Sequence, residues 1–237
     1  SGMPGLSDWI EQLIAESTGK NGNGRLPVVI ESSVSAIGSY APIVAFAGRA
    51  DLVVEADLGA QFIFWEWVTA LICFALQIDP FNQPNVTEAK ERTSALLEDW
   101  SGSAPVVTQV HTEGSVEIHS AETSLQEALD HLVDLVATDG YISIMAYLDR
   151  SVDAQIGELR RILAQKSARP VTFGWGPRFL HSTGQFHKGG PPNGVFLQIT
   201  GAAQTDFAIP GKGFSFSTLI AAQALGDAQA LASRQLP

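Results

Sequence analysis

The chain has 237 residues, 45% of them apolar, which is enough for one large or two modest domains with a packed core. It carries 14 Lys and Arg residues against 25 Asp and Glu residues, and the net charge of −11 argues against binding to nucleic acid or to an anionic membrane surface. The single cysteine, Cys73, argues against a disulfide framework and favours a cytoplasmic protein.

Short apolar runs alternate with helical patterns, so we predict an α/β fold with a mostly parallel sheet and helices on both faces. In residues 1–100 the patterns predict strands at 26–31, 43–46 and 52–55 and helices at 8–17, 60–78 and 84–99. Small and turn-forming residues predict a linker at 101–105. In residues 106–237 we predict a second α/β unit, with strands at 106–110, 115–119, 141–147, 170–175 and 194–200 and helices at 123–137, 152–166 and 215–234.

The stretch from Ala60 to Ile78 is the most apolar part of the chain and is long enough for a membrane span. Gln61 and Glu66 interrupt it, and no cluster of Lys or Arg flanks it, so we expect no contact with a membrane. A helix that is apolar on most sides then belongs to a core or to a subunit interface. We expect a homodimer that uses the aromatic face of this helix, formed by Phe62, Trp65, Val68 and Thr69.

Glu16 is the first candidate for chemistry. Trp9, Leu13 and Glu16 recur at the spacing of one helix face, so the carboxylate shares a stripe with two apolar side chains. Partial burial raises the pKa of a glutamate towards neutrality, as a base that removes a proton from carbon requires. The spacing also fits a glutamate that reaches into solvent from the last helical turn.

Three segments of the chain have distinctive amino-acid sequences. Residues 16–20 read Glu-Ser-Thr-Gly-Lys, and residues 79–86 read Asp-Pro-Phe-Asn-Gln-Pro-Asn-Val, with Lys90 in the helix that follows. Residues 176–190 read Gly-Pro-Arg-Phe-Leu-His-Ser-Thr-Gly-Gln-Phe-His-Lys-Gly-Gly. The first resembles the glutamate signature of the glucose-6-phosphate isomerase family, in which Asn usually stands where Thr18 is. The second resembles the Asn-Pro-Phe-Asp-Gln-Pro-Gly-Val element of its bacterial members, and the third resembles the isomerases that are fused to, or encoded beside, transaldolase.

The resemblance implies the reversible isomerisation of glucose 6-phosphate and fructose 6-phosphate through an enediolate. By match to the family's motifs, Glu16 would move the proton between C2 and C1, and Lys90 would assist ring opening or stabilise the enediolate. One base and one electrostatic stabiliser suffice for this reaction, so we expect no cofactor. The resemblance also implies that residues 1–100 are the C-terminal part of a sugar isomerase (SIS) domain.

The chain departs from the family in two ways. The family places a histidine for ring opening between the glutamate and the lysine, but no histidine occurs from Ser17 to Val110. We expect His181 or His187 to take that role. Family members also carry an upstream SIS domain, which supplies most phosphate contacts. We therefore expect this chain, which opens with Ser-Gly-Met, to be part of a longer protein and to have weak activity or none by itself.

A sugar phosphate is the expected partner, and with a net charge of −11 the few cations must gather where it binds. The segment between the strands predicted at 170–175 and 194–200 combines cations, hydroxyls and glycines, which suits anion binding after a parallel strand. The spacing of His181 and His187 is poor for a metal, so we expect no metal site. The candidate substrate-binding residues are Ser17, Thr18, Lys20, Gln83, Arg178, Ser182, Thr183, Gln185 and Lys188.

Two alternatives stay open. One is a non-catalytic module, derived from the same ancestor, that binds a sugar phosphate or mediates dimerisation. The other is an isomerase for a different sugar phosphate, such as mannose 6-phosphate. The sequence decides neither of these, nor whether the parent protein has transaldolase activity.

Overall fold

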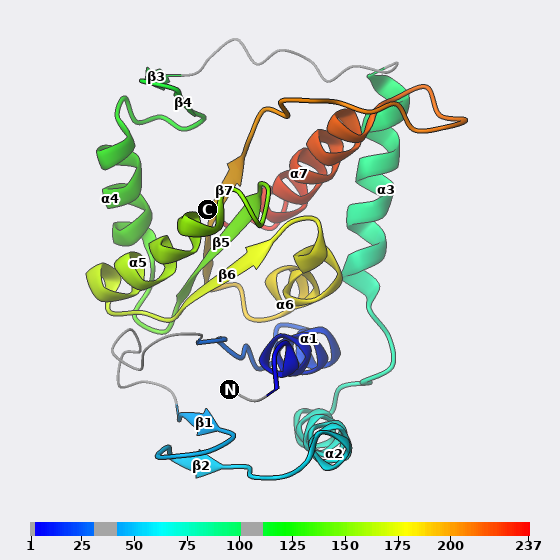
Figure 1. The fold of residues 1–237 in the computed structure, drawn as a ribbon, viewed down its shortest axis with the longest axis vertical. Coiled ribbons are helices and arrows are strands. Elements are labelled where there is room, and N and C mark those ends of the chain that lie inside the picture. Colours follow the sequence, from blue (N-terminus) through cyan, green and yellow to red (C-terminus); the bar gives the residue numbers. More distant parts are fainter. Residues whose placement is uncertain (1–2, 31–41, 101–110) are drawn as a thin grey trace.

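The computed structural model describes residues 3–30, 42–100 and 111–237 of the chain, which form a mixed α/β fold (Figure 1). The α/β class predicted from the sequence is therefore confirmed. The helices are α1 (Leu6–Thr18), α2 (Leu58–Leu76), α3 (Pro84–Asp99), α4 (Leu125–Leu135), η2 (Ala154–Glu158), α5 (Leu159–Ser167), η3 (Arg178–His181), α6 (Thr183–Gly189) and α7 (Phe216–Ala232). The strands are β1 (Val44–Ala45), β2 (Leu52–Val53), β3 (His111–Glu113), β4 (Val116–Ile118), β5 (Tyr141–Tyr147), β6 (Val171–Trp175) and β7 (Gly194–Thr200).

A parallel sheet of three strands, in the order β6-β5-β7, forms the centre of the second half of the chain. In the register, Ile142 of β5 lies between Val171 of β6 and Val195 of β7. All seven residues of β5 are buried. A strand that is covered on both faces needs apolar residues at nearly every position, which explains the continuous apolar run from Tyr141 to Tyr147.

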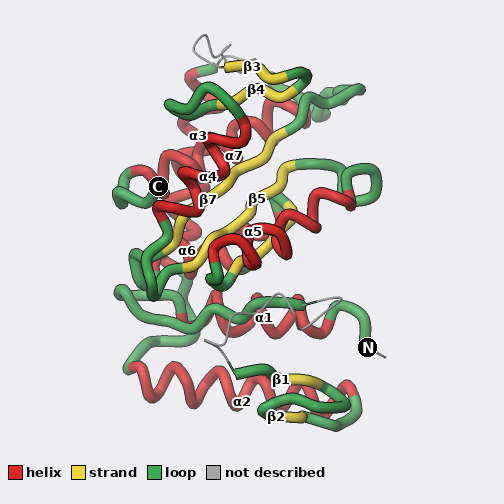
Figure 2. Tube along the Cα trace, turned by 90° about the vertical axis from the view of Figure 1, so that its left-hand side faces the viewer, coloured by secondary structure: helices red, strands yellow, loops and turns green. Residues whose placement is uncertain are grey.

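Helices cover both faces of this sheet (Figures 1 and 2). On one face, Leu132 of α4 and Leu163 of α5 pack against the side chains of Ile142 and Ile144. On the other face, the core contains residues of β5, η3 and α7, namely Met145, Tyr147, Phe179, Leu180, Ala224 and Leu231. The alternation of side chains along β5 therefore supplies two separate cores.

Helix α1 lies between the sheet unit and α2 (Figure 2). On one side, Ile10 and Ile14 pack against Trp65 of α2. On the other side, Ala15 packs against Tyr141 of β5 and Phe186 of α6. The unit predicted at 1–100 and the unit predicted at 106–237 thus share a packed core.

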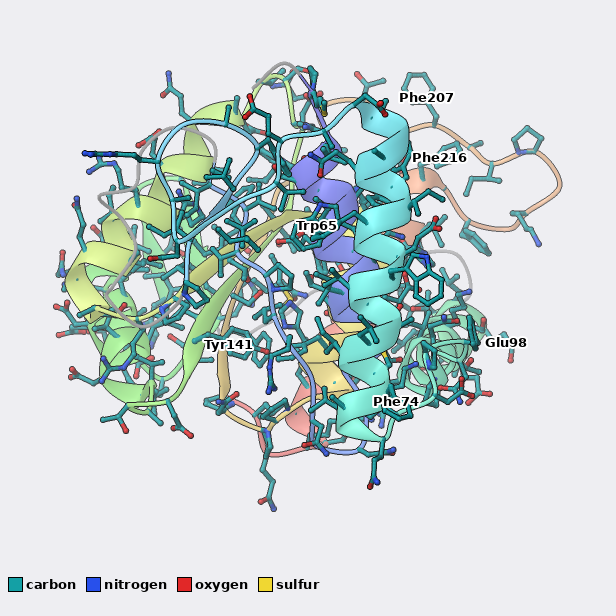
Figure 3. All side chains as sticks on the ribbon, turned by 90° about the horizontal axis from the view of Figure 1, so that it is seen from below. Trp65, Phe74, Glu98, Tyr141, Phe207 and Phe216 are labelled. Atoms are coloured by element: carbon teal, nitrogen blue, oxygen red, sulfur yellow. The ribbon has the colours of Figure 1, made fainter. Side chains whose placement is uncertain are left out.

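Asp57 caps the N-terminus of helix α2, and its carboxylate accepts a hydrogen bond from the backbone amide of Ala60 at 2.9 Å. Only Gln61, Trp65, Thr69 and Cys73 of its 19 residues are buried. The face expected at a dimer contact, which includes Trp65 and Val68, packs against α1 instead, so that prediction is wrong. Among the described helices it is the one that is long and apolar enough to cross a membrane. Seen from below, α2 lies in front of α1 with no described element over it (Figure 3).

Several element predictions need correction. Residues 26–30 form no strand, and β1 and β2 pair only with each other, so neither segment extends the central sheet. The helix predicted at 152–166 begins as the 3-10 helix η2, and residues 176–193, for which no helix is predicted, contain η3 and α6. The linker at 101–105 and the strand at 106–110 lie outside the described residues; β4 pairs with β3 as an antiparallel hairpin.

Candidate functional site

The side chain of Gln185 joins the three segments with distinctive sequences, residues 16–20, 79–86 and 176–190. Its Nε2 atom donates to the backbone oxygen of Gly19 at 2.7 Å and to Oδ1 of Asn85 at 2.8 Å. Its Oε1 atom accepts a hydrogen bond from the backbone amide of Asn85 at 3.0 Å. Gln185 is fully buried, so it fixes the C-terminal end of α1 and the start of α3 against α6. We call residues 16–20, residues 79–85 and Gln185 the three-motif junction.

Lys20 makes a second link within the junction. Its Nζ atom donates to the backbone oxygen of Asp79 at 2.6 Å, and only 3% of the residue is exposed. Burial lowers the pKa of Lys20 below its usual value, while Cys73, Asp79 and Glu16 act in the opposite direction. In this structure the ammonium therefore holds two chain segments together, although the sequence suggested a contact with substrate.

The thiol of Cys73 lies next to the same link. Its Sγ atom donates to the backbone oxygen of Ser17 at 3.6 Å, and the residue is fully buried. Burial raises the pKa of Cys73, which Lys20 partly opposes. A buried thiol with a raised pKa is a poor nucleophile, so its role here is to pack α2 against the end of α1.

Glu16 is half-buried in the last turn of α1, and Trp9 and Leu13 of the same stripe pack against the core between α1 and α2. Its Oε2 atom accepts a hydrogen bond from Nε2 of Gln12 at 3.3 Å. Glu16 also lies close enough to Lys20 to affect the pKa of that lysine. The carboxylate is thus held at the junction but keeps contact with solvent.

Lys90 is exposed on α3, where no described residue binds its side chain. A rise of about 1.5 Å per residue places it roughly 7.5 Å along the helix from Asn85, which contacts Gly19 through Gln185. Gln83 is the exposed residue that precedes α3, and its side chain does not cap the helix. Lys90 and Gln83 are accordingly free to meet a ligand near the junction.

Thr18 belongs to the framework of the junction. Its hydroxyl donates to the backbone oxygen of Ile14 at 2.7 Å and accepts from the backbone amide of Arg25 at 2.9 Å. These bonds close the loop between Gly19 and Gly24. A Cβ atom on Gly19 would come within 2.3 Å of Cα of Phe186, so the contact between α1 and α6 requires glycine at this position.

Helix η3 and helix α6 run alongside α1 in the same direction. Arg178 of η3 donates through Nη2 to the backbone oxygen of Asp8 at 3.3 Å. At the other end, the backbone oxygen of Gly189 accepts from the amide of Gly22 at 3.0 Å. His181 is exposed at the end of η3, between these two contacts. The exposed candidates Arg178 and His181 therefore lie along α1 but nearer to its N-terminal half than Gln185.

Glu11 is a titratable residue that the sequence analysis missed. It is 5% exposed, and burial, with Asp8 as a further cause, raises its pKa to about 8, while Arg178 acts in the opposite direction. Among the described residues none donates a hydrogen bond to its carboxyl group. Glu11, Ala15 and Thr18 recur at helical spacing and are all buried, so this stripe could have revealed it.

His187 lies in the core. Its Nδ1 atom is 2.8 Å from the hydroxyl of Tyr141, and its Nε2 atom is 3.1 Å from the hydroxyl of Ser143, which also accepts from Thr172. Burial, together with the charge of Lys188, lowers the pKa of His187 to about 3. With both ring nitrogens engaged and only 3% of the residue exposed, His187 stabilises the sheet and is out of reach of a substrate.

Lys188 also lies in the interior. Its Nζ atom forms an ion pair with Oδ1 of Asp227 on α7 at 2.6 Å, and both side chains are almost completely buried. Ser182 and Thr183 are buried as well, and the Ser182 hydroxyl donates to the backbone oxygen of Phe179 at 3.3 Å. These three predicted binding residues contribute to packing in this structure.

Residues 3–30, 42–100 and 111–237 contain no group of three His, Cys, Asp or Glu side chains arranged to hold a metal ion. Comparison of the chain with protein-family models, with curated proteins and with solved structures found no match. The exposed or half-buried candidates that remain are Glu16, Ser17, Gln83, Lys90, Arg178 and His181. These side chains include a base, cations and hydrogen-bond donors, and they are spread from the N-terminal half of α1, where Arg178 lies, to the start of α3.

Proposed function

We propose that this chain is the C-terminal portion of a cytoplasmic glucose-6-phosphate isomerase. Glu16 removes the proton from C2 of the open-chain sugar and returns it to C1, so no proton is gained or lost overall. Lys90 stabilises the negative charge of the enediolate between these two steps. Of the two histidine candidates, His181 is the exposed one, and it assists ring opening.

The junction around Gln185 is the observation that carries this proposal. The segments that resemble isomerase motifs are far apart in the sequence, yet one buried side chain bonds to residues 166 and 100 positions away in the other two. Because one site needs residues from all three segments, their contact at Gln185 supports a shared site. An SIS-like fold for residues 1–100, completed by an upstream domain that binds the phosphate, belongs to the same proposal.

The burial of His187 and Lys188 favours a second candidate, a module that binds a sugar phosphate without acting on it. With these two side chains in the core, fewer cations and histidines remain for chemistry than the sequence suggested. This module would share the junction with the isomerase but would not exchange protons on the sugar.

Proton exchange distinguishes the two candidates with high sensitivity. The purified chain is incubated with fructose 6-phosphate in deuterium oxide, and deuterium at C1 of the ketose and C2 of the aldose is followed by NMR. We expect slow incorporation that Glu16→Gln abolishes, because the amide cannot accept the proton. Glu98→Gln, an exposed carboxylate on α3, serves as the matched control and keeps the wild-type rate.

Two results would contradict the isomerase. If Glu16→Gln exchanges deuterium at the wild-type rate, a residue other than Glu16 is the base. Broadening of the phosphorus resonance of the sugar phosphate without any deuterium incorporation would show binding alone and would favour the module.

A further inference from the structure

Helix α2 carries a second apolar stripe on the side that faces away from α1. Its large members are well exposed, with Trp67 at 66%, Leu71 at 60% and Phe74 at 83%. The stripe reads as heptad positions a and d, with Ala60, Trp67 and Phe74 at a and Ile63 and Ala70 at d. Phe64 and Leu71 flank it, and all seven side chains are exposed.

We propose that this stripe is a two-fold interface, on which α2 of a second copy of the chain packs in antiparallel orientation. Helix α2 extends from residue 58 to residue 76, so Trp67 is its midpoint. A two-fold axis at Trp67 places position a opposite position a and position d opposite position d.

The side chains that then face each other are complementary in size. Ala60 of one copy meets Phe74 of the other, and Ile63 meets Ala70, so a large side chain lies against a small one in each pair. Trp67 packs against its own counterpart on the axis, and Phe64 lies beside Leu71 at the edge. A symmetric interface must be complementary to itself, and this stripe meets that condition.

Area and charge favour a second copy over a membrane. The exposed parts of the large apolar side chains amount to on the order of 700 Å² per chain, close to the roughly 800 Å² per partner of a stable interface. Glu66 is the only charged residue of α2, and a carboxylate in the middle of a spanning helix is costly. With a net charge of −11, the chain is also repelled by anionic lipids.

The molecular mass of the protein in solution tests whether this interface forms. In solution we expect a species of twice the 25.2 kDa chain mass by light scattering, and we expect Trp67→Glu to convert it to a monomer, because two carboxylates would meet on the axis. Val152→Glu is the matched control: Val152 is 77% exposed but lies outside α2, so this variant stays dimeric. A monomeric wild-type chain, or a dimeric Trp67→Glu variant, would overturn the proposal.

Cross-linking tests the orientation. Trp67→Cys should form a disulfide with itself under mild oxidation, whereas Ile63→Cys and Ala70→Cys should cross-link only when the two variants are mixed. The wild-type chain is the control, since Cys73 is fully buried. Self-linking of Ile63→Cys would show a parallel pair and overturn the antiparallel arrangement. If the wild-type chain floats with uncharged lipid vesicles and Trp67→Glu does not, the partner of the stripe is a membrane and not a second copy of the chain.

Discussion

The side-chain amide of Gln185 and the backbone oxygen of Gly19 form a buried hydrogen bond of 2.7 Å across 166 residues of sequence. The same amide also bonds to Asn85 of α3. Through these bonds a single side chain sets the position of the turn that follows Glu16 relative to the helix that carries Lys90.

Replacing Gln185 with methionine should cost about 2–3 kcal/mol of unfolding free energy, because polar groups of Gly19 and Asn85 then remain buried without partners. Urea denaturation measures the loss. Gln229→Met, at an exposed position of α7, should change stability by less than about 0.5 kcal/mol. Equal stabilities of the two variants would show that Gln185 does not hold the junction together.

Lys20 and Lys90, which both lie near the three-motif junction, should respond differently to substitution. Lys90→Ala should leave the unfolding free energy within about 0.5 kcal/mol of wild type, because Lys90 is exposed, but should slow deuterium exchange on the sugar. Lys20→Met should instead lower stability by about 1–3 kcal/mol, since the bond to Asp79 is lost. A destabilised Lys90→Ala chain with normal exchange would contradict the assigned role of Lys90.

The ion pair between Lys188 and Asp227 should show strong coupling in a double-mutant cycle. Lys188→Met leaves the carboxylate of Asp227 buried without its partner and should cost about 3–5 kcal/mol. Adding Asp227→Leu removes the stranded charge, so the double variant should regain most of that loss. If the two single losses simply add in the double variant, the pair is not coupled.

Glu11 should make stability fall as the pH rises. The pKa of its carboxyl is about 8 in the folded chain and 4.5 as a reference, so the folded state holds a proton between these values that the unfolded state has released. The contribution is complete below pH 4.5 and is lost as the pH rises to 8, by up to about 1.4 kcal/mol per pH unit. In Glu11→Gln this slope should disappear; an unchanged slope would show that Glu11 ionises normally.

His187 should have the opposite effect at lower pH. Its pKa is about 3 in the fold against a reference value of 6.5, so only the unfolded chain takes up the proton in between. This contribution is present above pH 6.5 and is lost as the pH falls towards 3. His187→Gln should reduce the acid sensitivity of unfolding, whereas the control His119→Gln, at an exposed position, should not.

The sequence predicted best those elements whose own residues determine them. The strands at 141–147 and 194–200 match β5 and β7, because apolar runs bounded by turn residues suit a sheet covered on both faces. The helix predicted at 84–99 matches α3, which Pro84 begins. In such segments local composition and burial agree, so the pattern alone is sufficient.

The sequence failed where distant contacts decide the structure. Helix α6 contains two glycines and polar side chains, so its local pattern predicts no helix. Gln185, His187 and Lys188 are satisfied there by partners at the C-terminal cap of α1 and on α3, β5 and α7, which no local pattern reveals. The same contacts explain why several predicted binding residues lie in the core. Glu16 and Lys90 do not take part in these contacts, and in the structure Glu16 is half-buried and Lys90 is exposed.

Because α1 packs between α2 and α6, the two halves of the chain share a core that a cut in the chain would divide. A cut between residues 101 and 110 would separate Ala15 from Tyr141 and Phe186, with which it shares a core. It would also separate α3 from α7, which pack side by side. Each fragment would then carry a bare apolar surface that matches the other, so the halves would behave as a split protein whose reassembly reports directly on this shared core.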